Sequence, residues 1–385
     1  MQCGPRALLM MCLLLALVAA RVGGASVVAE WDPETAEGRG ARSARLAALP
    51  QLDATRWANK GGHRCGATPA FPVNRQVLVK VRTTTGERQF VLYVPPAYTQ
   101  RGNSKVALQL LFHGLNDNCG RFLNTTGFVE HANRDGFIVA SLCGSVGFVG
   151  VGWNSGTCCG FTSPDSPNDF EFAEKVVEVV AAGACVDPAK VMAVGFSNGA
   201  MMAEVLGCEK PKVVRAVASV GGIVELRPGN EAGLEACGRD IRADNPDGRR
   251  PSVLMVHGNL DLIVPVGGDK LLGFPPLKDN VAAWANFNGC GDNANVTFNT
   301  PKYTNEVYVD CDSAAATSEP RMRRYLLRAR TAVTGYLTGQ NVASLRRSIV
   351  EIVHAIYSGH SWPEDDEFST TDYIYEFGKR VFSSY

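Results

Sequence analysis

The sequence has no surplus of charge of either sign. Its 385 residues include 38 Lys and Arg and 38 Asp and Glu, so the formal net charge is zero. Nucleic-acid-binding surfaces need a basic surplus and solvating tails carry acidic runs, so the sequence indicates neither class. The rest of the composition is that of an ordinary globular protein, long enough for one large domain or two smaller ones.

Spacings that are typical of metal and phosphate sites are also missing. No C-x-x-C pair meets a matching pair of Cys or His, as a structural zinc site requires. The glycine-rich stretch at 150–160 is not followed by G-K-[ST], which a phosphate-binding loop needs. We therefore expect no metal and no cofactor, and a chemistry that side chains carry alone.

No stretch is long enough for a comfortable membrane span. The apolar run at 7–20 follows Arg6 and precedes small residues at 23–25, and it is shorter than the roughly 20 residues that a span requires. This pattern predicts a secretory signal peptide over 1–25, and hence an extracellular protein without a membrane anchor; an uncleaved anchor is the alternative. Residues 26–64 are poor in aromatics and are predicted to form a poorly ordered lead segment.

Cysteine usage agrees with export. Of the 12 cysteines, Cys3 and Cys12 lie in the predicted signal peptide, which leaves ten. An even number in a secreted chain favours disulfides, and buried thiols are the alternative. Two N-x-[ST] sequons, at Asn124 and Asn295, are predicted glycosylation sites.

Apolar strands alternate with helical patterns along the chain. A hairpin is predicted from the alternating runs at 77–81 and 89–94. Further strands are predicted at 105–112, 136–142, 191–194, 213–220, 252–257 and 349–356, and helices at 170–182 and 200–206. This alternation predicts an α/β fold with a mostly parallel sheet covered by helices on both faces, whose ligands bind at the carboxyl ends of the strands.

One turn carries the most specific chemical signal. The G-x-S-x-G sequence at 195–199 separates the predicted strand at 191–194 from the predicted helix at 200–206. A strand, a G-x-S-x-G turn and a helix form the nucleophile elbow of an α/β-hydrolase, which exposes the serine hydroxyl above the sheet. An ordinary turn is the alternative for G-x-S-x-G alone, but the flanking elements favour Ser197 as a nucleophile.

The partners of Ser197 follow from their positions after strands. His360 lies in a loop after the strand at 349–356 and is the best general base among the six histidines. Asp261 lies in the loop after the strand at 252–257, where the acid of a triad belongs, although a turn-forming Asp is the alternative. The chain order Ser, Asp, His is that of the α/β-hydrolases.

Backbone and aromatic groups complete the predicted site. The N–H groups of Leu115, in the loop after the strand at 105–112, and of Asn198 are predicted to bind the oxyanion of an acyl-transfer reaction. A tight strand exit is the alternative for the first loop. Trp153, Phe196 and Trp362 are candidates for lining a substrate pocket, because aromatic faces stack on phenolic and sugar rings. Core positions are the alternative for each of them.

Six motifs together resemble a known family. They are HGLNDN (113–118), GWNSGTCCG (152–160), GFSNGAMMAEVLGCE (195–209), HGNLDLIVPVGG (257–268), WANFNGC (284–290) and GHSWP (359–363). In this order they resemble the secreted esterases that group polyhydroxybutyrate depolymerases with feruloyl and acetylxylan esterases, and GWNSGTCCG is closer to the feruloyl branch. The resemblance implies an α/β-hydrolase domain over 65–385, with Ser197, Asp261 and His360 as the triad and a disulfide between Cys290 and Cys311.

The chain departs from this family pattern at 314–348. Seven arginines and almost no acidic residues occur there, where the family has a short connection. A basic insertion that attracts anionic polysaccharide is one interpretation. A solvated helical face and an artefact of the gene model are the others.

The expected function is that of a secreted serine carboxylic ester hydrolase that works through an acyl-enzyme. The resemblance implies feruloyl or acetyl esters of plant cell-wall polysaccharide as substrates, so the expected partner is a polysaccharide-linked or polymeric ester. A polyhydroxybutyrate depolymerase is one alternative. A catalytically silent binding protein on the same fold is the alternative from another class.

Overall fold

The computed structural model describes a single sheet-containing unit, Leu49–Tyr385, and little of the preceding unit, Met1–Ala48. The described residues are 46–55, 63–147, 149–155, 159, 167–224, 250–270, 272–291, 293–308, 311 and 348–382. The predicted signal peptide at 1–25 lies outside them, as does the predicted insertion at 314–348 apart from its last residue. In the described ranges no helix is long and apolar enough to cross a membrane.

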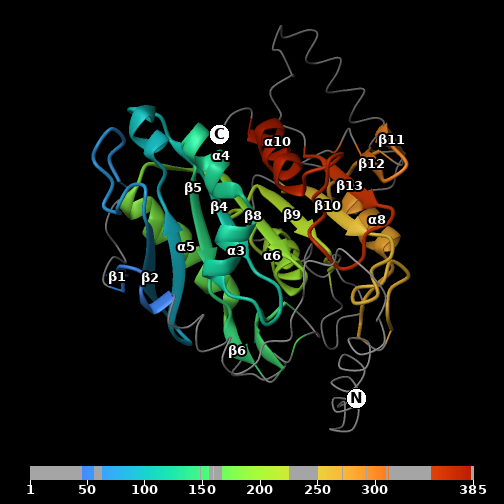
Figure 1. Cartoon of the computed structure of the whole chain (residues 1–385), viewed down its shortest axis with the longest axis horizontal. Helices are drawn as coiled ribbons and strands as arrows, with labels where there is room; N and C mark the ends of the chain where they lie inside the picture. Colours follow the sequence, from blue (N-terminus) through green and yellow to red (C-terminus); the bar gives the residue numbers. More distant parts are fainter. Residues whose placement is uncertain are drawn as a thin grey trace, which may run out of the picture. The chain divides into compact units, whose positions relative to one another are not determined.

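An eleven-stranded sheet runs through the described part of this unit (Figure 1). Its strand order is β1-β2-β3-β5-β4-β8-β9-β10-β13-β12-β11, and the six strands from β5 to β13 in this order pair in parallel. The strands are β1 Gln51–Asp53, β2 Gln76–Thr83, β3 Gly86–Tyr93, β4 Val106–Phe112, β5 Ile138–Leu142, β8 Val186–Phe196, β9 Ala216–Val220, β10 Ser252–Gly258, β11 Ala294–Asn299, β12 Tyr303–Tyr308 and β13 Val350–Ala355.

Helices cover both faces of the central strands. Every residue of β4, β5, β9 and β10 is buried, and since successive side chains point to opposite faces, neither face is open to water. Helix α6 packs on β8 and β9, and α10 packs on β8, β9 and β10. The helices are α3 Cys119–Thr125, α4 Phe128–Asp135, α5 Asp169–Gly183, α6 Asn198–Glu209, α8 Leu277–Phe287 and α10 Thr370–Phe382, with a 3₁₀ turn at Pro96–Arg101.

The predicted strands and helices are present, but the start of the unit differs from the prediction. Gln51–Asp53, inside the predicted lead segment at 26–64, forms β1 and pairs in parallel with β2. Leu52 packs against the core and Ala54 is buried, so the compact unit begins at Leu49 and not at Cys65. Three residues with a single apolar side chain carry too little periodicity to be recognised as a strand.

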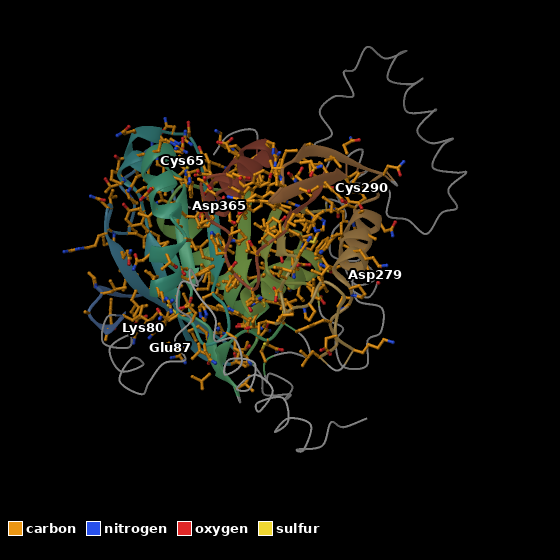
Figure 2. All side chains as sticks on the ribbon, turned by 45° about the vertical axis from the view of Figure 1, so that its right-hand side comes forward. Cys65, Lys80, Glu87, Asp279, Cys290 and Asp365 are labelled. Carbon is orange, nitrogen blue, oxygen red and sulfur yellow. A yellow bond between two sulfur atoms is a disulfide. The ribbon has the colours of Figure 1, made fainter. Side chains whose placement is uncertain are left out.

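Disulfides connect segments that are distant in the sequence. Cys65 pairs with Cys185, Cys119 with Cys143, and Cys290 with Cys311 (Cys65 and Cys290 are labelled in Figure 2). Cys159 and Cys208 are also disulfide-bonded. These cysteines are therefore oxidised and are not buried thiols, and the pair that the resemblance implies, Cys290–Cys311, is among them.

Candidate active site

The turn between β8 and α6 has the backbone of a nucleophile elbow. Ser197 has φ 54° and ψ −124°, a conformation that non-glycine residues rarely adopt outside functional turns. A Cβ atom on Gly195 would lie 2.0 Å from the carbonyl oxygen of Gly199. A Cβ atom on Gly199 would lie 2.1 Å from the carbonyl oxygen of Phe112 on β4. The turn therefore requires both glycines of the G-x-S-x-G sequence.

The three predicted triad residues meet at this turn. Nε2 of His360 lies 2.8 Å from Oγ of Ser197, and Nδ1 of His360 lies 2.7 Å from Oδ2 of Asp261. When Nδ1–H donates to the carboxylate, Nε2 is unprotonated and can accept the proton of the serine hydroxyl. This arrangement has the geometry of a nucleophile, a general base and an orienting acid.

Asp261 uses its two carboxylate oxygens differently. Oδ2 faces His360, whereas Oδ1 accepts hydrogen bonds from the N–H groups of Ile263 and Val264, both at 2.8 Å. Burial raises the pKa of Asp261, but the hydrogen bond and charge of His360 and the Val264 N–H outweigh it, so the pKa lies below its ordinary value. Asp261 is therefore ionised at neutral pH. Its Oδ1 also closes a turn, so the alternative role of a turn-forming Asp is present as well.

A second histidine lies behind this acid. Nε2 of His257 is 2.9 Å from the carbonyl oxygen of Val264 and 3.6 Å from Oδ2 of Asp261. Burial lowers the pKa of His257, so its neutral ring donates Nε2–H to that carbonyl. His257 thus stabilises the loop that carries Asp261, and none of the hydrogen bonds or ion pairs of the described residues joins it to Ser197.

The two predicted oxyanion donors belong to segments that meet at Ser197. A Cβ atom on Gly114, the neighbour of Leu115, would be 3.5 Å from Cβ of Ser197, so the loop after β4 contacts the elbow. Among the hydrogen bonds of the described residues, none uses the N–H of Leu115. The N–H of Asn198 lies in the first turn of α6, where the helix supplies no acceptor. Each N–H can therefore donate to a developing oxyanion.

His113 stabilises the loop after β4, which carries Leu115. Its buried ring accepts a hydrogen bond from the N–H of Gly144 at Nε2, 3.0 Å away, so Nδ1 carries the proton and donates to the carbonyl oxygen of Gly114 at 2.8 Å. Burial lowers the pKa of His113, which favours this neutral form. His113 is a structural residue here and does not act as a base toward Ser197.

The three candidate aromatic residues differ in their surroundings. Phe196 and Trp362 are half-buried, and the ring of Phe196 lies 5.1 Å from that of His360 and 6.5 Å from that of Trp362. Trp153 has no exposed surface, and its Nε1 donates to the carbonyl oxygen of His113 at 2.8 Å. The expected contact between Trp153 and substrate is therefore wrong, because the residue lies in the core and contacts one end of the loop after β4 from inside.

Other predicted sites are compatible with the structure without being tested by it. The side chains of Asn124, in α3, and Asn295, in β11, are exposed, as a glycan would require. Glycosylation at these residues stays a prediction. In the part of the chain that the structure describes, no cluster of three His, Cys, Asp or Glu has the geometry to bind a metal ion.

The fold of the chain is similar to that of a solved esterase. The chain aligns with an acetyl xylan esterase from Aspergillus awamori with a TM-score of 0.50 and 16% sequence identity, over 76% of this chain and 94% of that chain. No protein-family model matches the chain. At this identity the likeness establishes the fold alone, and the predicted α/β-hydrolase fold is confirmed.

Part of the chain is similar in sequence to feruloyl esterases. The chain is 29% identical to feruloyl esterase B of Piromyces equi over 224 residues, which are 58% of this chain and 39% of that protein. It is 26% identical to feruloyl esterase D of Neurospora crassa over 184 residues, 46% of this chain and 58% of that protein. The chain has the α/β-hydrolase fold and is similar in sequence to feruloyl esterases. It spans about half the length of these curated relatives, and the resemblance to this family is confirmed.

Proposed function

We propose that the chain is a serine carboxylic ester hydrolase. The observation that carries the proposal is the continuous hydrogen-bonded chain from Oγ of Ser197 through His360 to Asp261, with distances of 2.8 and 2.7 Å. Its position at a strained elbow supports the same chemistry, as do the adjacent backbone N–H groups of Leu115 and Asn198, which no hydrogen bond among the described residues uses. The similarity to feruloyl esterases supports it independently.

Acylation uses each of these groups in turn. His360 Nε2 accepts the hydroxyl proton while Oγ of Ser197 bonds to the ester carbonyl carbon, and the carbonyl π electrons move to its oxygen. The N–H groups of Leu115 and Asn198 stabilise that oxyanion, and one such donor typically contributes about 3 kcal/mol in the transition state. When the carbonyl re-forms, the ester C–O bond breaks and His360 gives its proton to the departing alcohol.

Deacylation repeats these steps with water. His360 accepts a proton from a water molecule, whose oxygen bonds to the acyl carbon and forms a second oxyanion. The bond to Ser197 then breaks, the serine oxygen takes the proton back, and the acid leaves. Asp261 keeps Nδ1 protonated and stabilises the imidazolium that forms in both halves of the reaction.

We further propose feruloyl or acetyl esters of plant cell-wall polysaccharide as the substrates, acted on outside the cell. The relatives' names, the half-buried Phe196 with His360 and Trp362 as ring neighbours, and the disulfides support this choice. A polyhydroxybutyrate depolymerase is the second candidate, because the same triad would cleave an aliphatic polyester. A catalytically silent binding protein is disfavoured by the intact geometry of all three triad residues.

The test compares the wild-type protein with Ser197→Ala on methyl ferulate, 4-nitrophenyl acetate and a hydroxybutyrate oligomer. We expect the wild type to hydrolyse the first two esters faster than the oligomer, and Ser197→Ala to lower kcat by roughly 10⁴-fold or more. Faster cleavage of the oligomer would favour the depolymerase. A folded wild-type protein without activity on any ester would contradict the proposed function.

A further inference from the structure

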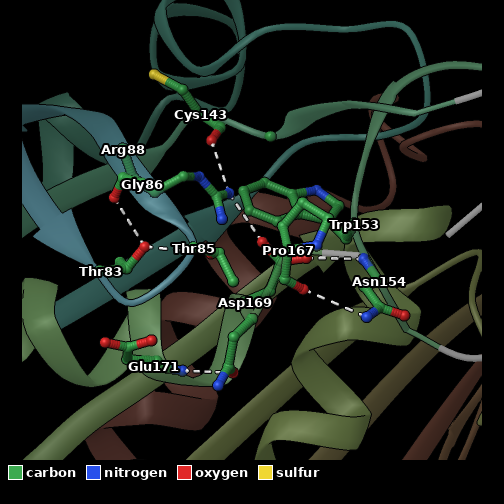
Figure 3. A network of polar contacts seen from close by, with 12 residues as sticks. Thr83, Thr85, Gly86, Arg88, Cys143, Trp153, Asn154, Pro167, Asp169 and Glu171 are labelled. Carbon is green, nitrogen blue, oxygen red and sulfur yellow. Dashed lines mark hydrogen bonds and ion pairs between the residues drawn. The ribbon is translucent and has the colours of Figure 1, made fainter. Parts of the chain in front are cut away.

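A buried ion pair lies outside the proposed catalytic residues. Nη2 of Arg88, on β3, is 2.8 Å from Oδ1 of Asp169, the first residue of α5 (Figure 3). Only 8% of the Arg88 side chain and 1% of the Asp169 side chain are exposed. A buried pair of this kind adds little net stability, since desolvation offsets the attraction between the charges. We therefore looked for the effect of this pair in the backbone groups that its two side chains bind.

The ion pair binds both ends of one backbone segment. Nη2 of Arg88 also donates to the carbonyl oxygen of Cys143 at 3.2 Å, and Oδ2 of Asp169 accepts the N–H of Asn154 at 2.8 Å (Figure 3). We call the described residues 143–147 and 149–155 the supporting loop. Its two ends are thus fixed by the two halves of one buried charge pair.

The supporting loop in turn fixes the residue after the nucleophile. Oδ1 of Asn198 accepts the N–H of Trp153 at 2.8 Å. Nδ2 of Asn198 donates to the carbonyl oxygen of Trp153 at 3.3 Å and to Oγ of Ser155 at 3.1 Å. The Asn198 side chain is buried, so these bonds hold Asn198, and its backbone N–H with it, against the supporting loop.

The same loop also supports the other proposed donor. Nε1 of Trp153 donates to the carbonyl oxygen of His113, and the N–H of Gly144 donates to Nε2 of His113 at 3.0 Å. The N–H of Asn116 donates to the carbonyl oxygen of Val151 at 2.7 Å. Leu115 lies between His113 and Asn116, so its N–H is positioned by contacts on either side.

We propose that Arg88 and Asp169 are positioning residues for the oxyanion hole, acting through the supporting loop on the N–H groups of Leu115 and Asn198. The inference rests on the proposed function, because it assigns these donors to an ester oxyanion. Displacement of preset donors by about 1 Å is expected to slow the chemical step by roughly 10²-fold, while ground-state binding changes little.

The test removes both charges together, so that no uncompensated charge stays buried. We expect the double variant Arg88→Met/Asp169→Leu to fold and to lower kcat on 4-nitrophenyl acetate by roughly 10- to 100-fold, with KM within about twofold. Phenylboronic acid, which adds to Ser197 as a tetrahedral anion, should lose affinity by the same factor as kcat. A purely structural role would lower the melting temperature without this parallel loss.

The matched control is the neighbouring pair Lys80–Glu87 on the same hairpin (Figure 2). Its atoms are 3.2 Å apart, but 30% and 41% of the two side chains are exposed. Lys80→Gln/Glu87→Gln should leave kcat, KM and boronate affinity unchanged, because no hydrogen bond or ion pair of the described residues joins either side chain to the supporting loop.

A second variant keeps the inference testable if the double variant does not fold. Asn198→Ala retains the backbone N–H but removes its link to Trp153 and Ser155, and it should lower kcat by a factor no larger than that of the double variant, with little change in KM. Combined with Arg88→Met/Asp169→Leu, it should add little further loss, because both changes act through one loop.

The outcomes separate the two proposals. An active wild type together with wild-type kcat in either folded variant would overturn the positioning role and leave the proposed function intact. Full additivity of the two changes would also overturn it. A wild type that hydrolyses no ester would contradict the proposed function and this inference with it.

Discussion

At the scale of single residues, Asp261 combines a structural role with its proposed catalytic role. Its Oδ1 closes the turn to Ile263 and Val264, and its Oδ2 orients His360. A carboxylate can accept the hydrogen bonds from the turn and from His360 because both of its oxygens are acceptors. An amide of the same shape has one oxygen and one NH₂ group, so it can satisfy one side only.

We predict that Asp261→Asn folds but lowers kcat by about 10⁴-fold, because an amide N–H facing Nδ1 selects the wrong imidazole tautomer. Kinetics on 4-nitrophenyl acetate and a thermal melt check this. The control is Asp279→Asn, an exposed change in the first turn of α8 (Figure 2), which should leave kcat unchanged. Near-wild-type kcat in Asp261→Asn would refute the role of Asp261.

At the scale of elements, parallel pairing brings the site together. Phe112 of β4 pairs with Gly195 of β8, and His257 of β10 pairs with His354 of β13. The loops after β4, β8, β10 and β13, which carry Leu115, Ser197, Asp261 and His360, therefore leave the sheet at the same edge, where ligands of open α/β sheets bind. The elbow contacts β4 so closely that Gly199 has no room for a side chain.

We predict that Gly199→Ala destabilises the protein by several kcal/mol or displaces the elbow, with at least about a 100-fold loss of kcat, because the added methyl meets backbone atoms that cannot rotate away. Denaturant unfolding and kinetics measure both effects. Gly267→Ala is the matched control, since its Cβ would meet nothing within 4 Å. Equal stability and equal kcat in the two variants would contradict the expected clash between an added methyl at Gly199 and the backbone of β4.

At the scale of the whole molecule, burial keeps most of the described histidines neutral. It is the largest cause of a lowered pKa at four of them, His113, His131, His257 and His354. The unfolded chain protonates each histidine near its ordinary pKa of 6.5, whereas the folded chain does so only at lower pH. The unfolded state thus binds more protons as the pH falls below 6.5, and each histidine lowers the free energy of unfolding there.

His131 offers the cleanest test, since it joins α4 to α10 at the periphery. It lies among Asp372, Arg134 and Asp135, and the pKa remains lowered mainly by burial. We predict that His131→Gln loses less free energy of unfolding than the wild type between pH 7 and 5.5, by up to about 1.4 kcal/mol per pH unit. Denaturant titrations at several pH values measure the free energy of unfolding of both proteins. An identical pH dependence in His131→Gln and in the wild type would contradict the prediction.

The residues that follow long apolar strands could be predicted from the sequence. Ser197, Asp261 and His360 each come after a strand with a clear apolar run, and the parallel order of strands places such loops together. The hairpin of β6 and β7, at Ser145–Gly147 and Gly150–Gly152, was not predicted, nor was β1, because three-residue strands lack a periodic signal.

Contacts between distant residues could not be predicted. Arg88 and Asp169 are 81 residues apart, and no local pattern links them. The burial of Trp153 likewise depends on the supporting loop folding beneath His113, which residue type alone does not indicate. The sequence thus indicated the three residues that the structure brings together, Ser197, Asp261 and His360, whereas the contacts around them emerged only from the fold.

The most direct test of the account is identification of the covalent intermediate. The protein is mixed with 4-nitrophenyl acetate, quenched in acid, and examined by intact mass and peptide mapping. We predict a burst of 4-nitrophenolate and one acetyl group on Ser197, both absent from Ser197→Ala. Acetyl on a different residue, or hydrolysis that persists in Ser197→Ala, would contradict the proposed role of Ser197.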